Sequence, residues 1–321
     1  MPDVLVAGPL HPSGRALLDA AAGIKVRYVE ETSEPSLVAN ISGADAVLLR
    51  TQPMSAATVA NAPRLRIVSR HGVGYDAVDV EVLNERGITL AVCGDVNSTS
   101  VAEHAAMLIL AASKRALRGD KAVRSGPWEW RNDLESQDLA ERTLLQIGYG
   151  RIGRRIARAM TGFGMHVCAF DPYLQREGWP EGHVTPVEEL QDGLAKADVV
   201  SLSVPGGDTP LIGRAELAAT KDGVVIVNTA RGGIVDEVAL IEALKRGKVG
   251  AAGLDVFESE PLPADHPFLG MDQVILSPHI AGLTREAAER MAIGSARNIL
   301  DFFNGTLDPA LVVNREQLAH D

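Results

Sequence analysis

Cysteine is scarce in this chain, which has 321 residues and only two cysteines, Cys93 and Cys168. Both lie inside apolar runs of strand length, so we expect two buried free thiols rather than a disulfide framework. Free thiols are typical of a reducing compartment, and the cytoplasm is therefore the expected location.

Long hydrophobic runs are missing as well. The longest, Ala105–Ala112, is far shorter than the roughly 18 apolar residues that a membrane span requires, and we expect it to be a buried helix segment. The N-terminus has no basic stretch followed by an apolar segment, so no signal peptide is predicted. We therefore expect no membrane partner.

Positive charge is also in short supply. Lys and Arg number 31 against 42 Asp and Glu, which gives a formal net charge of −11 at pH 7. This balance disfavours binding to nucleic acids, whereas a small anionic substrate stays compatible because local cations decide its binding. No repeat or low-complexity segment stands out, and no metal site is predicted.

The chain does contain one segment with the order of a dinucleotide-binding unit, Thr143–Asp171. A strand-length apolar run is followed by Gly148, Gly150 and Gly153 in G-x-G-x-x-G spacing, then by a helical pattern, a second strand and an acid. The first glycine makes the tight turn, the second admits a pyrophosphate, and the third lets helix and strand pack closely. The helix N-terminus then faces the phosphates.

Asp171 indicates which dinucleotide is bound. It lies about 20 residues beyond the turn, where a carboxylate accepts hydrogen bonds from the adenosine ribose. A carboxylate at this point repels a 2′-phosphate, and Pro172 and Tyr173 bring no cation to offset the repulsion. The sequence therefore favours NAD over NADP, with Arg176 as the nearby cation that leaves NADP open.

Short strands and helices alternate on both sides of this unit, which predicts parallel sheets covered by helices on both faces. We expect an α/β protein with two doubly wound domains. Residues 98–284 would form a Rossmann-type domain that binds NAD. Residues 1–97 and 285–321 would form a smaller, flavodoxin-like substrate domain, to which a final helix, Arg285–Phe303, returns the chain.

Three local features lie at the start of the predicted NAD-binding domain. Ser100 opens a capping-box sequence, S-x-x-E, ahead of an apolar helix at Val101–Ala112, which should be buried against the other domain or a second subunit. Residues 118–138 are polar and are predicted to form an arm or loop. Trp128 and Trp130 in this segment are expected to anchor a subunit contact, although they could line a ligand. A homodimer is therefore expected.

Three side chains with catalytic chemistry follow successive predicted strands: Arg231, Glu260 and His279. Ligands of doubly wound sheets bind at the carboxyl ends of strands. An imidazole can donate a proton to a carbonyl oxygen as hydride reaches the carbon, and a carboxylate partner would fix its tautomer. An arginine can bind a substrate carboxylate. Each residue alone could be an ordinary loop residue, but together they predict proton-coupled hydride transfer.

The chain resembles the D-isomer-specific 2-hydroxyacid dehydrogenases, a family that includes the D-3-phosphoglycerate dehydrogenases. Five motifs carry the resemblance: HGVGYDAVD (71–79), GYGRIG (148–153), NTARGGIVDE (228–237), GLDVFESEP (253–261) and SPHIAG (277–282). It implies an NAD-dependent oxidoreductase acting on the CH–OH group of a small 2-hydroxy acid, with 3-phosphoglycerate among the candidates. Arg231, Glu260 and His279 would be the catalytic set, with His279 as the acid/base.

The same resemblance implies further cofactor contacts. Arg151 and Ile152 would present their backbone to the pyrophosphate, and Pro205 would lie near the adenine. Ala230 and Asp255 would line the nicotinamide, with Asp255 bonding its carboxamide.

Substrate contacts are expected in the HGVGYD loop. Its glycines permit a concavity of backbone N–H groups suited to a carboxylate, and the resemblance assigns this role to Val73 and Gly74. A tight turn needed only for packing is the alternative. Arg50 matches a position near the substrate and could meet a phosphate together with His71, or it could be a surface arginine.

Two departures and two alternatives remain. Gln146 stands where the family usually has an aliphatic residue, and the chain ends soon after its last helix, so a short form without a regulatory domain is expected. Formate dehydrogenases share the fold but have a glutamine in place of the Glu260-type carboxylate. NAD-sensing co-repressors built on this fold retain the catalytic residues, so a binding protein stays open.

Overall fold

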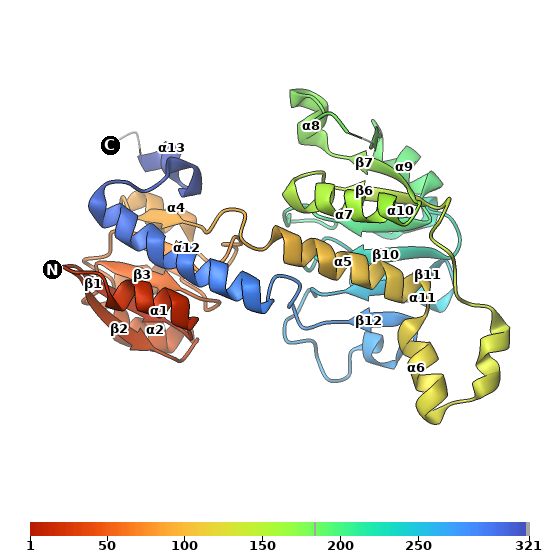
Figure 1. Ribbon diagram of the computed structural model, residues 1–321, viewed down its shortest axis with the longest axis horizontal. Coiled ribbons are helices and arrows are strands. Elements are labelled where there is room, and N and C mark those ends of the chain that lie inside the picture. Colours follow the sequence, from red (N-terminus) through yellow and green to blue (C-terminus); the bar gives the residue numbers. More distant parts are fainter. Residues whose placement is uncertain (183, 319–321) are drawn as a thin grey trace. The chain divides into compact units, whose positions relative to one another are not determined.

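The computed structural model describes residues 1–182 and 184–318 and divides into two compact units (Figure 1). Unit 1 combines residues 1–97 with the segment from residue 283 onward, and unit 2 comprises residues 98–282. Residues 319–321, which were assigned to the substrate domain, lie outside the described residues. Within the described part of the chain, no helix is long and apolar enough to cross a membrane.

Unit 1 is built on a five-stranded sheet in the order β2-β1-β3-β4-β5, in which all neighbours are parallel. Its strands are β1 (Asp3–Ala7), β2 (Lys25–Val29), β3 (Ala46–Leu49), β4 (Ile67–Arg70) and β5 (Thr89–Ala91). Its helices are α1 (Pro12–Asp19), α2 (Glu34–Ile41), α3 (Ala56–Ala60), α4 (Val80–Glu85), α12 (Arg285–Asn304), η3 (Pro309–Leu311) and α13 (Arg315–Leu318). This strand order is flavodoxin-like.

The strands of unit 1 bury side chains on both faces, as parallel sheets require. Leu5 packs on the layer of α2, α3 and α4, and its neighbour Val4 packs on the layer of α1 and α12. Helix α12 begins after the N-cap Thr284 and ends at Gly305, which has a φ of +72°. Helix α12 packs against α1 and β4 (Figure 1) and is part of unit 1.

Unit 2 is built on a seven-stranded parallel sheet in the order β12-β11-β10-β9-β6-β7-β8. Its strands are β6 (Thr143–Ile147), β7 (His166–Phe170), β8 (Thr185–Pro186), β9 (Val199–Leu202), β10 (Val224–Asn228), β11 (Val249–Leu254) and β12 (Val274–Leu276). Its helices are α5 (Ser98–Ser113), α6 (Ala116–Ser125), η1 (Trp128–Asp133), α7 (Arg151–Gly162), α8 (Pro172–Glu177), α9 (Leu190–Lys196), α10 (Arg214–Ala219), α11 (Glu237–Lys245) and η2 (Pro267–Gly270).

This order is that of a Rossmann fold with one further strand, and it reverses between β6 and β9. Helices α5 and α7 cover one face of the sheet, onto which α5 packs Leu108 and α7 packs Ile156. Helices α9, α10 and α11 cover the other face around Leu145 and Leu240 (Figure 1). The predicted fold class, with two doubly wound parallel-sheet domains, is confirmed.

Two local predictions differ from the structure. Helix α5 begins at Ser98, so Ser100 lies within its first turn and is not the N-cap. The polar segment 118–138 contains most of α6 and all of η1 (Figure 1), because ion pairs and ring stacking order it in place of an apolar core. Pro186 lies on the edge strand β8, where a missing N–H is tolerated, and α9 begins at Leu190.

Candidate active site

The glycine-rich turn joins β6 to α7 at the carboxyl edge of the unit 2 sheet. Gly148 has a φ of +83°, and a Cβ added to Gly153 would lie 2.1 Å from the carbonyl oxygen of Gly148. A Cβ on Gly150 would meet no described atom within 4 Å. The third glycine is therefore required by the packing of the helix, while the second leaves the turn open toward α7, whose first residues are Arg151 and Ile152.

Gln146, the unusual polar residue of the central strand, stabilises this turn. Its side chain is fully buried, and its Nε2 donates hydrogen bonds to the carbonyl oxygens of Ile147 at 3.2 Å and Gly148 at 3.1 Å. An aliphatic side chain could make neither bond. The departure from the family pattern therefore has a local structural role.

Asp171 lies at the end of β7 and is hydrogen-bonded to the same turn. Its Oδ2 accepts from the N–H of Tyr149 at 2.8 Å, and its Oδ1 accepts from Tyr173 at 3.0 Å and Leu174 at 3.2 Å. Because a carboxylate has about four acceptor positions, these bonds leave capacity for one more donor. The carboxylate is held beside the turn, as contact with a ribose hydroxyl would require.

Further polar groups lie past the ends of β9 and β10. Pro205 is exposed, whereas Ala230 is buried and donates its N–H to Asn228 Oδ1 at 3.0 Å. The hydroxyl oxygens of Ser203 and Thr229 are buried and have no hydrogen-bond partner among the described residues. Since buried polar groups are normally paired, this edge fits a ligand rich in donors and acceptors, as a dinucleotide is.

Two of the three predicted catalytic side chains are in direct contact. His279 Nδ1 lies 2.7 Å from Glu260 Oε2, and Glu260 Oε1 accepts from the N–H of Phe257 at 3.0 Å. Nδ1 therefore donates to the carboxylate, which leaves Nε2 without a partner among the described residues. The side chains of His279 and Glu260 are 52% and 36% exposed, so a small molecule can reach this pair.

Asp255 holds the backbone that carries His279. The N–H of His279 donates to the Asp255 carbonyl oxygen at 2.8 Å, and the histidine has a left-handed φ of +53°, which non-glycine residues rarely adopt. The buried Asp255 carboxylate accepts from the N–H groups of Ile280 at 2.9 Å and Ala281 at 2.8 Å and from the Ser277 hydroxyl at 2.5 Å. Most of its acceptor capacity therefore serves the histidine loop.

Arg231 lies in the loop after β10, which packs against the loop that carries Glu260. The side chain of Asn228 closes the first loop by donating to the Arg231 carbonyl oxygen at 2.8 Å. A Cβ added to Gly232 would lie only 1.8 Å from the carbonyl oxygen of Phe257. The two backbones are thus in contact, and the three predicted catalytic residues come from adjoining loops at one edge of the sheet.

Two residues outside the predicted site, His104 and Asn228, also organise these loops. His104 on α5 has its Nε2 2.8 Å from the hydroxyl oxygen of Ser277, which in turn donates to Asp255. No local pattern marks His104, because its partners are far away in the sequence. Asn228 could have been predicted from the sequence, because a polar residue directly at the end of a buried strand indicates a functional or structural hydrogen bond at that edge of the sheet.

The predicted substrate residues lie at the carboxyl edge of the unit 1 sheet. Arg50 follows β3 and donates through Nη1 to the carbonyl oxygen of Pro9 at 2.7 Å. His71 follows β4 and is 6% exposed, with no partner for its Nε2 among the described residues. Burial, together with the charge of Arg50, lowers the pKa of His71 to about 3. Val73 and Gly74 are half-buried and follow in the same turn.

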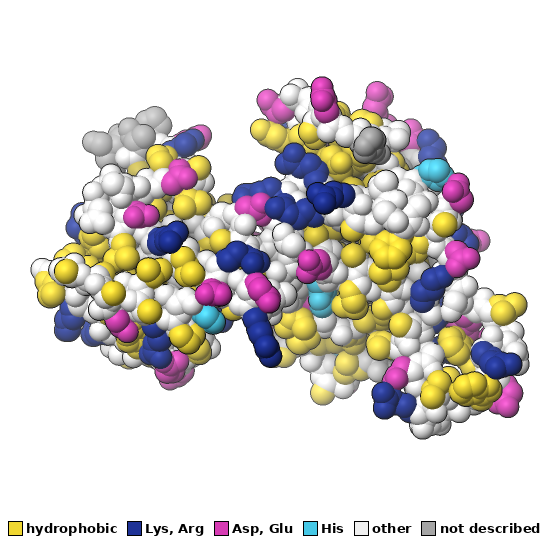
Figure 2. All heavy atoms as spheres, viewed as in Figure 1, with side chains coloured by type: hydrophobic (Ala, Val, Ile, Leu, Met, Phe, Trp, Pro, Cys, Tyr) yellow, Lys and Arg dark blue, Asp and Glu magenta, His cyan; other side chains and the backbone are white. Residues whose placement is uncertain are grey.

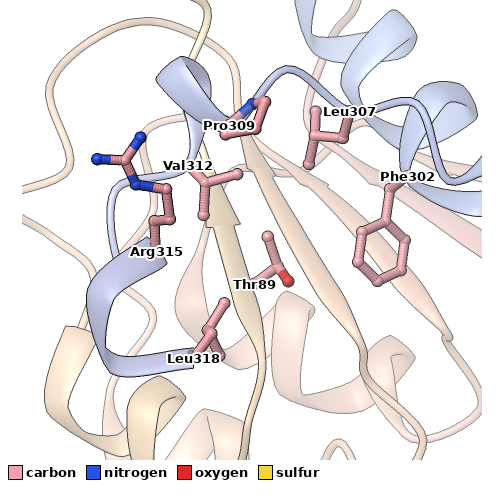
Figure 3. Close-up of a pocket in the computed structure, with 7 residues that line it drawn as sticks. All are labelled: Thr89, Phe302, Leu307, Pro309, Val312, Arg315 and Leu318. Atoms are coloured by element: carbon pink, nitrogen blue, oxygen red, sulfur yellow. The ribbon is translucent and has the colours of Figure 1, made fainter. Parts of the chain in front are cut away.

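A separate pocket of about 320 Å³ lies elsewhere in unit 1. Side chains from β5, α12, η3 and α13 line it, among them Phe302, Val312 and Leu318, with Arg315 as its charged residue (Figure 3). None of the predicted site residues lines this pocket. It is therefore not the candidate active site.

An imidazole held by a carboxylate at the dinucleotide edge of a Rossmann-type sheet provides a proton donor beside the binding place of a hydride carrier. Fold and site thus define the class of NAD-dependent dehydrogenases. A sequence profile described as "D-isomer specific 2-hydroxyacid dehydrogenase, NAD binding domain" matches residues 106–281. The chain belongs to the D-isomer specific 2-hydroxyacid dehydrogenase family, as predicted, and unit 2 contains its NAD-binding domain.

Individual relatives differ in name and length. A D-3-phosphoglycerate dehydrogenase of Mycobacterium leprae is 39% identical over 304 residues, which cover 93% of this chain but 56% of the relative. This chain therefore spans little more than half of that protein. A glyoxylate reductase of Thermofilum pendens is 36% identical, with 99% of this chain and 96% of the relative covered. A solved structure from Thermus thermophilus superposes with a TM-score of 0.88 at 33% identity, covering 97% of this chain and 99% of the other.

Proposed function

We propose that the chain catalyses the NAD-dependent interconversion of a small D-2-hydroxy acid and its 2-oxo acid. The observation that carries this proposal is the 2.7 Å hydrogen bond between Glu260 and His279 at the edge of the NAD-binding sheet. NAD, when bound, exchanges a hydride with C2 of the acid. The protein residues bind the acid and move the proton.

Each catalytic residue acts at a defined place in this reaction. During reduction, His279 donates the proton from Nε2 to the C2 oxygen, and during oxidation it takes the proton back. Glu260 fixes the tautomer through Nδ1 and stabilises the imidazolium by its charge. Arg231 binds the substrate carboxylate and withdraws electron density from the adjacent carbonyl.

The substrate panel that tests this function contains glyoxylate, hydroxypyruvate and phosphohydroxypyruvate with NADH or NADPH, and formate with NAD. His279→Ala should lower turnover of the best 2-oxo acid by about two to four orders of magnitude. His166→Ala is the matched control, because this histidine is 67% exposed at the start of β7, and it should keep wild-type turnover. Near-normal turnover of the His279 variant would remove the histidine from the mechanism.

The same panel separates the enzyme from the alternatives. Turnover of formate alone would favour a formate dehydrogenase. Tight NADH binding without turnover of any acid would favour an NAD-sensing binding protein. A clear preference for NADH over NADPH is expected because of the Asp171 carboxylate.

A phosphate subsite at Arg50 and His71 is the feature that would separate phosphoglycerate from unphosphorylated acids. Its support is a guanidinium beside a buried imidazole whose Nε2 has no partner among the described residues. Arg50→Ala should then lower kcat/KM for phosphohydroxypyruvate by about tenfold or more, as loss of a charge-assisted hydrogen bond implies. The kcat/KM for glyoxylate should stay within about twofold of the wild-type value. Arg64→Ala, which removes an exposed arginine from the same unit, is the control. Equal losses on both acids would contradict a phosphate at Arg50.

A homodimer is the second part of the proposal. Large apolar side chains are exposed on α5 and on the α6–η1 arm, which projects from unit 2 (Figures 1 and 2). They include Met107 at 43%, Val123 at 68%, Trp128 at 60% and Leu134 at 84% exposure. Where exposed apolar side chains gather into a patch, they mark a protein interface. Trp130, in contrast, packs under Arg118 within its own arm.

Light scattering coupled to size exclusion tests the dimer. The wild-type chain should elute with twice its formula mass, and Trp128→Asp combined with Leu134→Asp should shift the mass to that of a monomer. Phe163→Asp, a similarly exposed apolar residue at the end of α7, should leave the dimer intact. A monomeric wild-type chain at micromolar concentration would contradict the proposal.

A further inference from the structure

A second carboxylate–imidazole pair lies behind the catalytic one. Glu237, the first residue of α11, is 9% exposed, and its Oε2 lies 3.2 Å from Nε2 of His266. The ring of His266 is oriented by its other nitrogen, because Nδ1 accepts from the N–H of Phe268 at 3.4 Å. The proton is therefore on Nε2, which donates to the Glu237 carboxylate.

Glu237 does not act as an ordinary acid at a helix start. Acids in a first helical turn usually remain in water, where they interact with the helix dipole. Here Glu237 Oε1 makes its hydrogen bond outside α11: it accepts from the N–H of Glu258 at 2.8 Å. In return, the N–H of Glu237 donates to Glu258 Oε1 at 3.2 Å. Burial is the main reason that the pKa of Glu237 is raised above its ordinary value.

This exchange of hydrogen bonds joins two catalytic loops. Glu237 lies where the loop that contains Arg231 ends and α11 begins. Glu258 lies two residues before Glu260. The neighbouring N–H of Phe257 donates to the Glu260 carboxylate at 3.0 Å, and the other carboxylate oxygen meets His279 at 2.7 Å. Gly232 packs on the same Phe257 backbone. The position of Glu260 thus depends on a backbone stretch that Glu237 holds from behind.

We infer that Glu237, supported by His266, is a positioning residue of the catalytic site: it holds residues 257–258 so that Glu260 stays aligned with His279. The inference rests on the proposed function, because it assigns Glu237 an effect only through Glu260. Glu237 itself touches neither substrate nor cofactor in this role.

The test is a double-mutant cycle with Glu260, measured as reduction of the best 2-oxo acid of the panel by NADH. Glu237→Ala should lower kcat about tenfold, while KM for NADH changes less than about twofold, since the dinucleotide turn lies on other loops. In a Glu260→Gln background the same Glu237→Ala change should alter kcat by less than about twofold, because interactions through a shared partner are not additive.

Matched variants separate positioning from general loss of structure. Glu237→Gln keeps an oxygen for the Glu258 N–H and should retain kcat within about threefold of wild type. Glu242→Ala removes a glutamate from the same helix that pairs with Arg214, and should leave kcat unchanged. If Glu237→Ala does not fold, His266→Asn provides the second route, with a smaller loss of kcat that also vanishes in the Glu260→Gln background.

The possible outcomes decide between the two proposals. If Glu237→Ala lowers kcat by the same factor in the wild-type and Glu260→Gln backgrounds, the positioning role is overturned. It is also overturned if Glu237→Ala has wild-type kcat while His279→Ala is inactive. Near-normal turnover of His279→Ala would instead overturn the proposed function itself. Non-additivity together with rescue by glutamine would support the inference.

Discussion

His71 should resist protonation far below the usual range of histidine, and this should make unit 1 sensitive to acid. The imidazole is 6% exposed beside Arg50, and burial with that neighbouring charge lowers its pKa to about 3. The perturbation is a fall in pH from 7 to 4.5. The variant His71→Asn, which cannot titrate, provides the comparison.

The sign follows from proton binding in the two states. An unfolded histidine has a pKa near 6.5, so below that pH the unfolded chain binds a proton that the folded chain refuses. Stability is therefore fully present above about pH 6.5 and is lost as the pH falls toward 3. Each pH unit in this window is worth about 1.4 kcal/mol, so about two units between pH 6.5 and 4.5 should destabilise the fold by about 2.7 kcal/mol.

Two measurements test this reasoning. In NMR spectra, the ring C–H resonances that disappear in His71→Asn should not shift between pH 8 and 4.5. In denaturant unfolding, the free energy of unfolding of the wild-type chain should fall by about 2 to 3 kcal/mol more than that of the variant over the same pH range. The contributions of acidic groups are the same in both chains and cancel in this difference. A ring titration midpoint between pH 5.5 and 7, or parallel stability curves, would refute the prediction.

Three further predictions concern residues that the packing fixes. Gly153→Ala places a methyl group 2.1 Å from the Gly148 carbonyl oxygen, so fluorescence titration should give an NADH Kd raised by about tenfold or more, and an unchanged Kd would contradict the turn. Asp255→Asn places an amide N–H₂ opposite the N–H of Ala281 and should lower kcat by about tenfold or more, since a buried unsatisfied group costs about 1–3 kcal/mol. Wild-type kinetics of this variant would show that the carboxylate is dispensable. Leu5→Ala, at a fully buried position, should destabilise unit 1 by about 2–5 kcal/mol in calorimetry, whereas a loss below 1 kcal/mol would contradict the described core.

The sequence was sufficient for features whose physical cause is local. The glycine spacing at 148–153 specifies a turn, because each glycine answers a steric demand of the strand–turn–helix unit. Strands such as Val224–Asn228 are predictable from sequence, since buried parallel strands are continuous apolar runs between turn residues. The pairing of Glu260 with His279 followed from fold reasoning, as both lie past the carboxyl ends of neighbouring strands.

Features that depend on distant partners were not predictable in this way. Helix α6 and the 3₁₀ turn η1 bury no complete side chain. Their order comes from Arg118, which binds Glu135 at 2.6 Å and stacks on Trp130. The predicted start of α5, Val101, lies three residues after the observed start, Ser98, because a serine with correct capping spacing can equally lie inside a helix. The hydrophobic periodicity of the sequence indicates neither the contacts of Arg118 nor the residue at which α5 begins.

The geometry of the proposed catalytic site belongs to this second group. Arg231, Glu260 and His279 all lie in loops, where the backbone has no hydrogen-bond ladder of its own to fix it. Two buried carboxylates supply that constraint, Asp255 for the histidine loop and Glu237 for the glutamate loop. Supporting residues that hold functional groups within fractions of an ångström are as necessary as the groups themselves. A motif that names only the reacting side chains therefore describes the chemistry, while the alignment on which the rate depends is set by residues that the substrate never touches.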